Sequence, residues 1–158
     1  MTDISGEGSG ITENFQFYKN KNILIIGGNG FIGSHLTEKL IKTGANITIV
    51  GKKSKPKNFK NINEIKYVKT DLTELKECKK IIKNFDIVFQ LAGIAGGIEY
   101  SASNHGSLFT KNSMINLNTL EAAKESSVEF YQYLSSVGIY PNKKNLLKEE
   151  DGFEKDPD

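Results

Sequence analysis

The feature that most constrains the fold is a glycine-rich segment, residues 27–33, directly after a short aliphatic run. The run covers residues 23–26, and the segment reads GGNGFIG. A short aliphatic run closed by glycines is typical of a strand buried on both faces of a parallel sheet. From Phe31 to Thr43 apolar residues recur every four positions, which predicts an amphipathic helix that ends at Gly44. We therefore expect a strand, a glycine-rich turn and a helix in succession.

Strand-like and helix-like segments alternate along the rest of the chain. Further strands are expected at residues 47–50, 65–69, 87–91 and 130–134. One helix face is marked by Leu75, Cys78, Ile81 and Ile82, and a longer helix covers residues 114–123. Because parallel strands need helical crossovers, this order predicts a doubly wound α/β parallel sheet. The polar residues 1–20 are expected to form a flexible arm before a single domain, residues 21–158.

Composition excludes several classes of protein. The chain has 158 residues and a formal net charge of +2, which calls for neither nucleic acid nor an anionic membrane as partner. No apolar run is long enough to cross a bilayer and no signal peptide pattern is present, so we expect a cytoplasmic protein. A single cysteine, Cys78, excludes an internal disulfide and a cysteine-built zinc site, and no metal site is expected. All 21 basic residues are lysines, so no guanidinium is available to bind an anion.

The spacing of the glycines has a mechanical explanation. Gly27 permits the tight turn, Gly30 lets the backbone approach a pyrophosphate, and Gly33 lets the helix pack closely on the sheet. The N–H groups at the start of the helix then face the phosphates. The alternative is a glycine-rich turn that binds no ligand.

The Gly-x-x-Gly-x-x-Gly spacing resembles that of the extended short-chain dehydrogenase/reductase superfamily, the NAD-dependent epimerase/dehydratase family. Four further segments resemble that family: residues 70–72, 91–93, 116–123 and 134–141. The resemblance covers about residues 20–158 and implies a Rossmann-type fold. Residues 95–98, 112–115 and 139–141 are most similar to the GDP-mannose 3,5-epimerase and GDP-fucose synthase group. Those enzymes place an acid/base cysteine two residues before the tyrosine that matches Tyr140, where this chain has Gly138, which cannot move a proton.

The resemblance also implies a set of site residues. The expected cofactor contacts are Gly27, Asn29, Gly30, Phe31, Ile32, Gly33, Lys52, Lys53, Asp71, Leu72, Leu91, Ala92, Gly93, Asn116 and Leu134. Among these, Asp71 matches the aspartate that contacts the adenine ring. Ser136 matches the catalytic serine, which hydrogen-bonds a sugar hydroxyl or ketone during hydride transfer. The expected substrate contacts are Gly96, Gly97, Ser136 and Val137.

The end of the second strand bears on which nicotinamide cofactor is used. An Asp or Glu at that place hydrogen-bonds the ribose 2′-hydroxyl and disfavours a 2′-phosphate. Here Gly51 is followed by Lys52, Lys53 and Ser54, with no carboxylate. NADP is therefore favoured over NAD. The alternative is that these lysines belong to a solvated surface loop.

The chain matches only the first part of the family's pattern. The family's general base is a tyrosine with a lysine four residues later, which lowers the pKa of the tyrosine. Tyr140 and Lys144 have that spacing, but Tyr140 already matches the Ile-Tyr-Pro position, so we interpret it as coincidence. We expect an enzyme about twice as long, truncated here after the fifth strand, so that this fragment alone is inactive. The alternative is an inactive NAD(P)-binding regulatory or structural module.

The resemblance implies partners for the full-length protein as well. Its substrate is expected to be a nucleotide-diphosphate sugar, with a GDP-sugar favoured, and the protein is expected to be a homodimer. His105, placed by its sequence in a loop over residues 101–106, is a further candidate for contact with the sugar.

Overall fold

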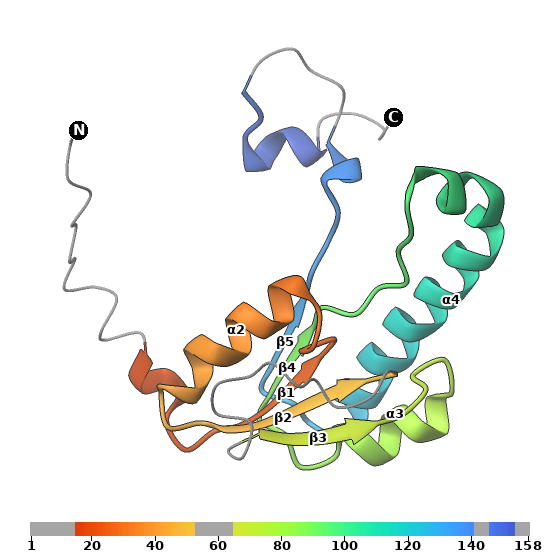
Figure 1. The fold of residues 1–158 in the computed structure, drawn as a ribbon. Coiled ribbons are helices and arrows are strands. Elements are labelled where there is room, and N and C mark those ends of the chain that lie inside the picture. Colours follow the sequence, from red (N-terminus) through yellow and green to blue (C-terminus); the bar gives the residue numbers. More distant parts are fainter. Residues whose placement is uncertain (1–14, 53–64, 141–145, 154–158) are drawn as a thin grey trace.

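The computed structural model describes residues 15–52, 65–140 and 146–153, and Figure 1 shows their fold. Five parallel strands form one sheet in the order β3-β2-β1-β4-β5. The strands are β1 (Asn22–Ile26), β2 (Asn46–Gly51), β3 (Ile65–Lys69), β4 (Ile87–Gln90) and β5 (Phe130–Tyr133). The helices are α2 (Phe31–Ile41), α3 (Leu75–Ile82) and α4 (Ile98–Glu125), with 3₁₀ turns η1 (Gln16–Tyr18), η3 (Val137–Ile139) and η4 (Glu149–Phe153). The doubly wound parallel sheet predicted from the sequence is confirmed.

The central strand β1 explains why the sheet is covered on both faces. Residues 23–26 are completely buried, and β1 pairs with β2 on one side and β4 on the other. Since successive side chains point to opposite faces, Leu24 and Ile26 pack toward α3 and α4, whereas Ile23 and Ile25 pack toward α2. This is the arrangement that a continuous aliphatic run predicts.

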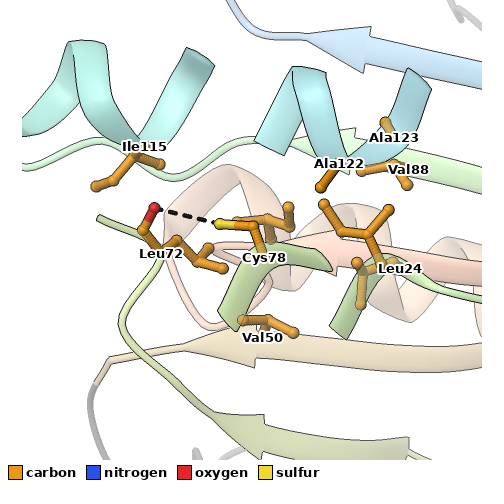
Figure 2. Packing of buried hydrophobic residues seen from close by; sticks show 10 residues of the cluster. Leu24, Val50, Leu72, Cys78, Val88, Ile115, Ala122 and Ala123 are labelled. Atoms are coloured by element: carbon orange, nitrogen blue, oxygen red, sulfur yellow. Dashed lines mark hydrogen bonds between the residues drawn. The ribbon is translucent and has the colours of Figure 1, made fainter. Parts of the chain in front are cut away.

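Cys78 on α3 belongs to the buried hydrophobic cluster that contains Leu24 and Ile26 and that lies between the sheet and the helices α3 and α4 (Figure 2). Its thiol donates a hydrogen bond to the carbonyl oxygen of Leu72, at 3.3 Å. Burial raises the pKa of the thiol to about 11. The helix face that the sequence pattern assigned to Cys78 is therefore a packed face, and a buried thiol with a raised pKa is unreactive.

The structure corrects one local prediction. The long helix α4 begins at Ile98, so His105 lies within this helix and not in a loop. The helical geometry is interrupted at Asn104 (φ −132°, ψ 16°), whose side-chain amide donates to the Tyr100 carbonyl. The polar, glycine-containing sequence of this segment is what suggested a loop.

The 3₁₀ turn η1 packs against the domain just before β1. Of the expected arm, residues 1–14 lie outside the described residues. Tyr18 in η1 packs against the cluster on the α2 face of the sheet, and its ring meets that of Phe17 edge-on. Within residues 15–52, 65–140 and 146–153, every helix is too short or too polar to span a bilayer.

Candidate functional site

A cavity of about 530 Å³ opens at the carboxyl ends of the central strands. It lies where the strand order reverses, since the chain passes from β1 to β2 and β3 on one side and to β4 and β5 on the other. Open α/β sheets bind ligands at this switch point. The cavity is lined by Ile26, Gly27, Asn29, Gly30, Val50, Gly51, Lys52, Thr70, Asp71, Leu72, Thr73, Leu91, Ala92, Gly93, Ile94, Ala95 and Ile115.

The glycine-rich turn forms the floor of this cavity. Gly27 has φ +77°, and a Cβ there would lie 2.8 Å from the backbone nitrogen of Ala92. A Cβ on Gly33 would collide with the Gly27 carbonyl oxygen. Helix α2 begins directly after Gly30, and the first N–H groups of a helix lack intrahelical acceptors. Gly27 and Gly30 thus form a cradle of bare backbone at the positive end of a helix, which fits the pyrophosphate of a dinucleotide.

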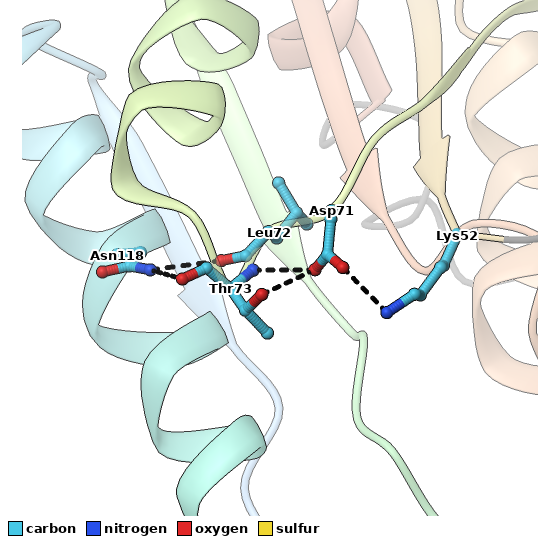
Figure 3. Close-up of polar contacts among 5 residues, drawn as sticks. All are labelled: Lys52, Asp71, Leu72, Thr73 and Asn118. Atoms are coloured by element: carbon cyan, nitrogen blue, oxygen red, sulfur yellow. Dashed lines mark hydrogen bonds and ion pairs between the residues drawn. The ribbon is translucent and has the colours of Figure 1, made fainter.

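The carboxylate of Asp71 lies on the side of the cavity where β2 and β3 end (Figure 3). Asp71 accepts hydrogen bonds from Lys52 Nζ at 2.8 Å, from the Thr73 N–H at 3.1 Å and from the Thr73 hydroxyl at 2.8 Å. The bond from Lys52, with those from Thr73, lowers the pKa of Asp71 to about 2. The side-chain amide of Asn118 on α4 donates to the carbonyl oxygens of Leu72 and Thr73. This loop therefore presents an ionised carboxylate on a braced backbone.

The end of β2 carries no acidic side chain and has little room for one. A Cβ on Gly51 would lie 3.0 Å from Asn29 Oδ1 and 3.1 Å from the Tyr67 hydroxyl. A longer side chain at this place requires both neighbours to shift. The first charged residue after β2 is Lys52, which lines the cavity. Lys53, the other predicted contact, lies outside the described residues.

Two buried or half-buried amides position the backbone that leaves β4. Gln90 is 1% exposed; its amide nitrogen donates to the Ala92 carbonyl and to Asn116 Oδ1, and its oxygen accepts from the Ala92 N–H. Asn112 bonds both the N–H and the carbonyl of Ile94, at 2.7 and 3.0 Å. The sequence interpretation missed Gln90 and the role of Asn112. A lone amide at the end of an aliphatic strand, and an asparagine four residues before Asn116, were the available signals.

The structure brings together many, but not all, of the predicted site residues. Those that line the cavity are Gly27, Asn29, Gly30, Lys52, Asp71, Leu72, Leu91, Ala92 and Gly93. Asn116 lies behind the lining, bonded to Gln90, and Gly33 is buried beneath the turn. Phe31 and Ile32 at the start of α2, and Leu134 after β5, are exposed.

The predicted substrate residues lie outside the cavity lining. Gly96 and Gly97 precede α4, and the ring of Tyr100 fills the space that a side chain on Gly96 would need. Ser136 follows β5 and is exposed; its Oγ accepts a hydrogen bond from the Gly138 N–H at 3.2 Å. Val137 is the first residue of η3.

Comparison with known proteins identifies relatives of the whole described fold. The family model for the NAD dependent epimerase/dehydratase family matches residues 23–157. GDP-mannose 3,5-epimerase 1 of Oryza sativa subsp. indica is 35% identical over 140 residues, which are 85% of this chain and 37% of the rice protein. The solved structure of epimerase Mth375 from Methanothermobacter thermautotrophicus matches with a TM-score of 0.77 and 31% identity, over 90% of this chain and 44% of that one.

A second solved structure holds ligands. MoeE5, in complex with UDP-glucose and NAD, matches with a TM-score of 0.70 and 27% identity, over 82% of this chain and 41% of that chain. The chain thus spans less than half the length of these relatives. Fold, glycine-rich turn and family model agree, and the chain belongs to the NAD dependent epimerase/dehydratase family.

Proposed function

We propose that the whole protein is a nucleotide-sugar epimerase, dehydratase or reductase that works by hydride transfer through a nicotinamide cofactor. The observation that carries this proposal is the cradle of bare backbone at Gly27 and Gly30, which lies against the residues that follow β4 and lines the same cavity as the Asp71 carboxylate. The cradle suits a pyrophosphate and the carboxylate suits the adenine end of the same molecule. When bound, the nicotinamide ring supplies the hydride acceptor and donor.

The chain's own residues favour NADP over NAD. Lys52 follows β2, where a carboxylate would otherwise select for a ribose 2′-hydroxyl. Gly51, the last residue of β2, and its close neighbour Asn29 carry no charge, so the strand end itself supplies no carboxylate to bind the ribose 2′-hydroxyl. A lysine ammonium is a suitable partner for a 2′-phosphate. The NAD in the MoeE5 complex belongs to that relative, and titration of this chain with both cofactors decides the preference.

Ser136 is the proposed catalytic hydroxyl. An Oγ that accepts a bond from the Gly138 N–H can still donate its own hydrogen, so it can bind a sugar oxygen and orient it. Gly96, Gly97 and Val137 are the proposed substrate contacts. At Gly97 the space beside the backbone is open, so a sugar can approach it closely, whereas at Gly96 the Tyr100 ring occupies that space. Since these residues lie beyond the cavity lining, the substrate would extend outward from the nicotinamide end.

The proposed substrate is a nucleotide-diphosphate sugar, with a GDP-sugar favoured. Residues 95–98, 112–115 and 139–141 support this preference, as does the similarity to the rice GDP-mannose 3,5-epimerase 1. Against it stand Gly138, which cannot serve as an acid or base, and the UDP-glucose in the MoeE5 complex. GDP-mannose and UDP-glucose are therefore the two substrates to compare.

We further propose that the 158 residues on their own bind the cofactor only weakly and do not turn over a sugar. Loss of a hydride from a sugar carbon requires a base that takes the hydroxyl proton. Apart from Tyr140 and Lys144, the sequence after Ser136 contains no tyrosine with a lysine four residues later.

The expectation of a cytoplasmic protein stays a prediction.

The outer face of α4 supports the proposal that the protein is a homodimer. Met114, Leu117 and Leu120 recur every three residues on this helix and are 41%, 66% and 50% exposed. Apolar side chains in such a stripe are typical of helix–helix interfaces. Analytical ultracentrifugation of the wild type and a Leu117→Lys variant tests this, since a charge in the interface should shift a dimer toward monomer.

The central experiment measures cofactor binding by calorimetry and then looks for a sugar product by NMR. We expect binding of NADPH with the 158-residue chain, weaker binding of NADH, and no product from either sugar. Gly27→Ala should abolish cofactor binding, whereas Gly44→Ala, at a turn away from the cavity, should not. Absence of binding refutes the cofactor site, and a sugar product refutes the proposed inactivity. Binding without turnover by the whole protein would favour a regulatory module instead.

A further inference from the structure

Two residues expected to bind different parts of the cofactor are in contact with each other. Lys52 follows β2 and is the proposed partner of a ribose 2′-phosphate, whereas Asp71 follows β3 and is the proposed partner of the adenine. Lys52 Nζ lies 2.8 Å from Asp71 Oδ2, at the edge of the cavity that both residues line (Figure 3). The two recognition groups therefore cannot act independently.

Asp71 is the fixed member of this pair. Its other oxygen accepts from both the N–H and the hydroxyl of Thr73, and Asn118 braces the carbonyls of Leu72 and Thr73 from α4. A carboxylate that is held on one oxygen by its own loop stays in place when a partner leaves the other oxygen.

Lys52 is the mobile member. Its side chain is 71% exposed, against 42% for Asp71, and a lysine has a long flexible stem with three donor hydrogens. Ion pairs this exposed are weak, so a stronger anion can take the ammonium away. A 2′-phosphate is such an anion, since it offers several charged oxygens.

Moving Lys52 onto a 2′-phosphate has a consequence for Asp71. The carboxylate loses its counter-charge and faces a second negative group across the same small space. When the ribose carries only a hydroxyl, Lys52 can remain on Asp71 and no such repulsion arises.

We infer that Lys52 is shared between Asp71 and the ribose 2′-position, so that Asp71 opposes the binding of a 2′-phosphate and sets the balance between NADP and NAD. Asp71 is then a specificity-determining residue as well as an adenine contact. The inference rests on the proposed function, because it requires a dinucleotide in this cavity.

The test uses two ligands that differ only in the phosphate concerned, adenosine 5′-monophosphate and adenosine 2′,5′-bisphosphate. Calorimetry gives a dissociation constant for each, and the selectivity is the first constant divided by the second. The variants are Lys52→Met, Asp71→Asn and the double substitution. Lys80→Met is the matched control, because Lys80 also forms an exposed ion pair, with Glu77 on α3 away from the cavity.

We expect Lys52→Met to lower the selectivity about threefold to tenfold, and Asp71→Asn to raise it by a similar factor. The double variant should fall back to the value of Lys52→Met, because no lysine remains to be released. Lys80→Met should leave the ratio unchanged. Asparagine preserves the shape of Asp71 and can still accept from Thr73, and melting curves confirm that each variant is folded.

Three results would overturn the inference while leaving the cofactor site intact. These are an unchanged or lower selectivity in Asp71→Asn, equal shifts in Lys52→Met and Lys80→Met, and effects that simply multiply in the double variant. If the wild type binds neither nucleotide, the proposed function fails together with the inference. The two failures are thus distinguishable.

Discussion

Replacement of Gln90 by leucine tests whether a buried amide, and not the aliphatic strand around it, holds the exit of β4. The Gln90 side chain makes three hydrogen bonds, two with the backbone of Ala92 and one with Asn116. Leucine has a similar volume but leaves these partners unpaired. A net loss of about 1 kcal/mol per bond, with partial rescue by water, gives roughly 2–4 kcal/mol of lost unfolding free energy. For a chain of this length that corresponds to a fall in melting temperature of roughly 5–15 °C.

The assay is urea unfolding followed by circular dichroism, with the midpoint and slope fitted for each variant. Gln132→Leu is the control, because it replaces the same residue type on the neighbouring strand β5 at a position where the side chain is exposed. We expect that control to change the free energy of unfolding by less than about 0.5 kcal/mol. Equal destabilisation by the two substitutions, or a Gln90→Leu protein as stable as the wild type, would refute the assigned role of the amide.

Three further predictions follow from single residues. Gly27→Ala should destabilise by about 2–5 kcal/mol, because φ is +77° and the new Cβ would crowd Ala92. Gly44→Ala has nearly the same φ, +78°, but its new Cβ would meet only the Lys19 side chain at an ordinary contact distance of 3.7 Å, so it should cost only about 1–2 kcal/mol, as urea titrations of both will reveal. Because the folded-state pKa of Asp71 is about 2 against an ordinary 3.8, its contribution to stability is present above pH 3.8 and lost as the pH falls toward 2; the urea midpoint of the wild type should therefore approach that of Asp71→Asn over this window, and parallel curves would contradict the pair. Cys78, buried and with its pKa raised to about 11, should react with a thiol reagent only when urea unfolds the chain, so rapid labelling of the native protein would show that the core is open.

The parts of the fold that the sequence predicted well are those where one local pattern has one structural solution. The aliphatic side chains of residues 23–26 point to both faces of the strand, so they are all removed from water only in the middle of a sheet that is covered on both faces. The glycine spacing likewise predicted the turn, because Gly27 and Gly33 occupy places where a Cβ meets backbone atoms. Both features could be predicted from a local pattern, although the contacts that they make, such as that of Gly27 with Ala92, are with distant segments.

Features that arise from pairing of distant residues were not predictable. The ion pair between Lys52 and Asp71 joins the ends of two strands, and nothing in either local sequence indicates the contact. The role of Gln90 likewise depends on Asn116, a partner on α4 that the local sequence around β4 does not indicate. His105 was assigned to a loop because its polar neighbours hide a helix that bends at Asn104.

The edge strand β5 has a practical consequence for producing this chain. Within the described residues its hydrogen-bonded neighbour is β4, and its apolar side chains Phe130 and Tyr133 are 43% and 48% exposed. An open edge beside exposed aromatic rings is a template on which another chain can add a strand. We therefore expect the 158-residue protein to self-associate as its concentration rises, and Phe130→Lys, which places a charge on that strand, should raise its solubility.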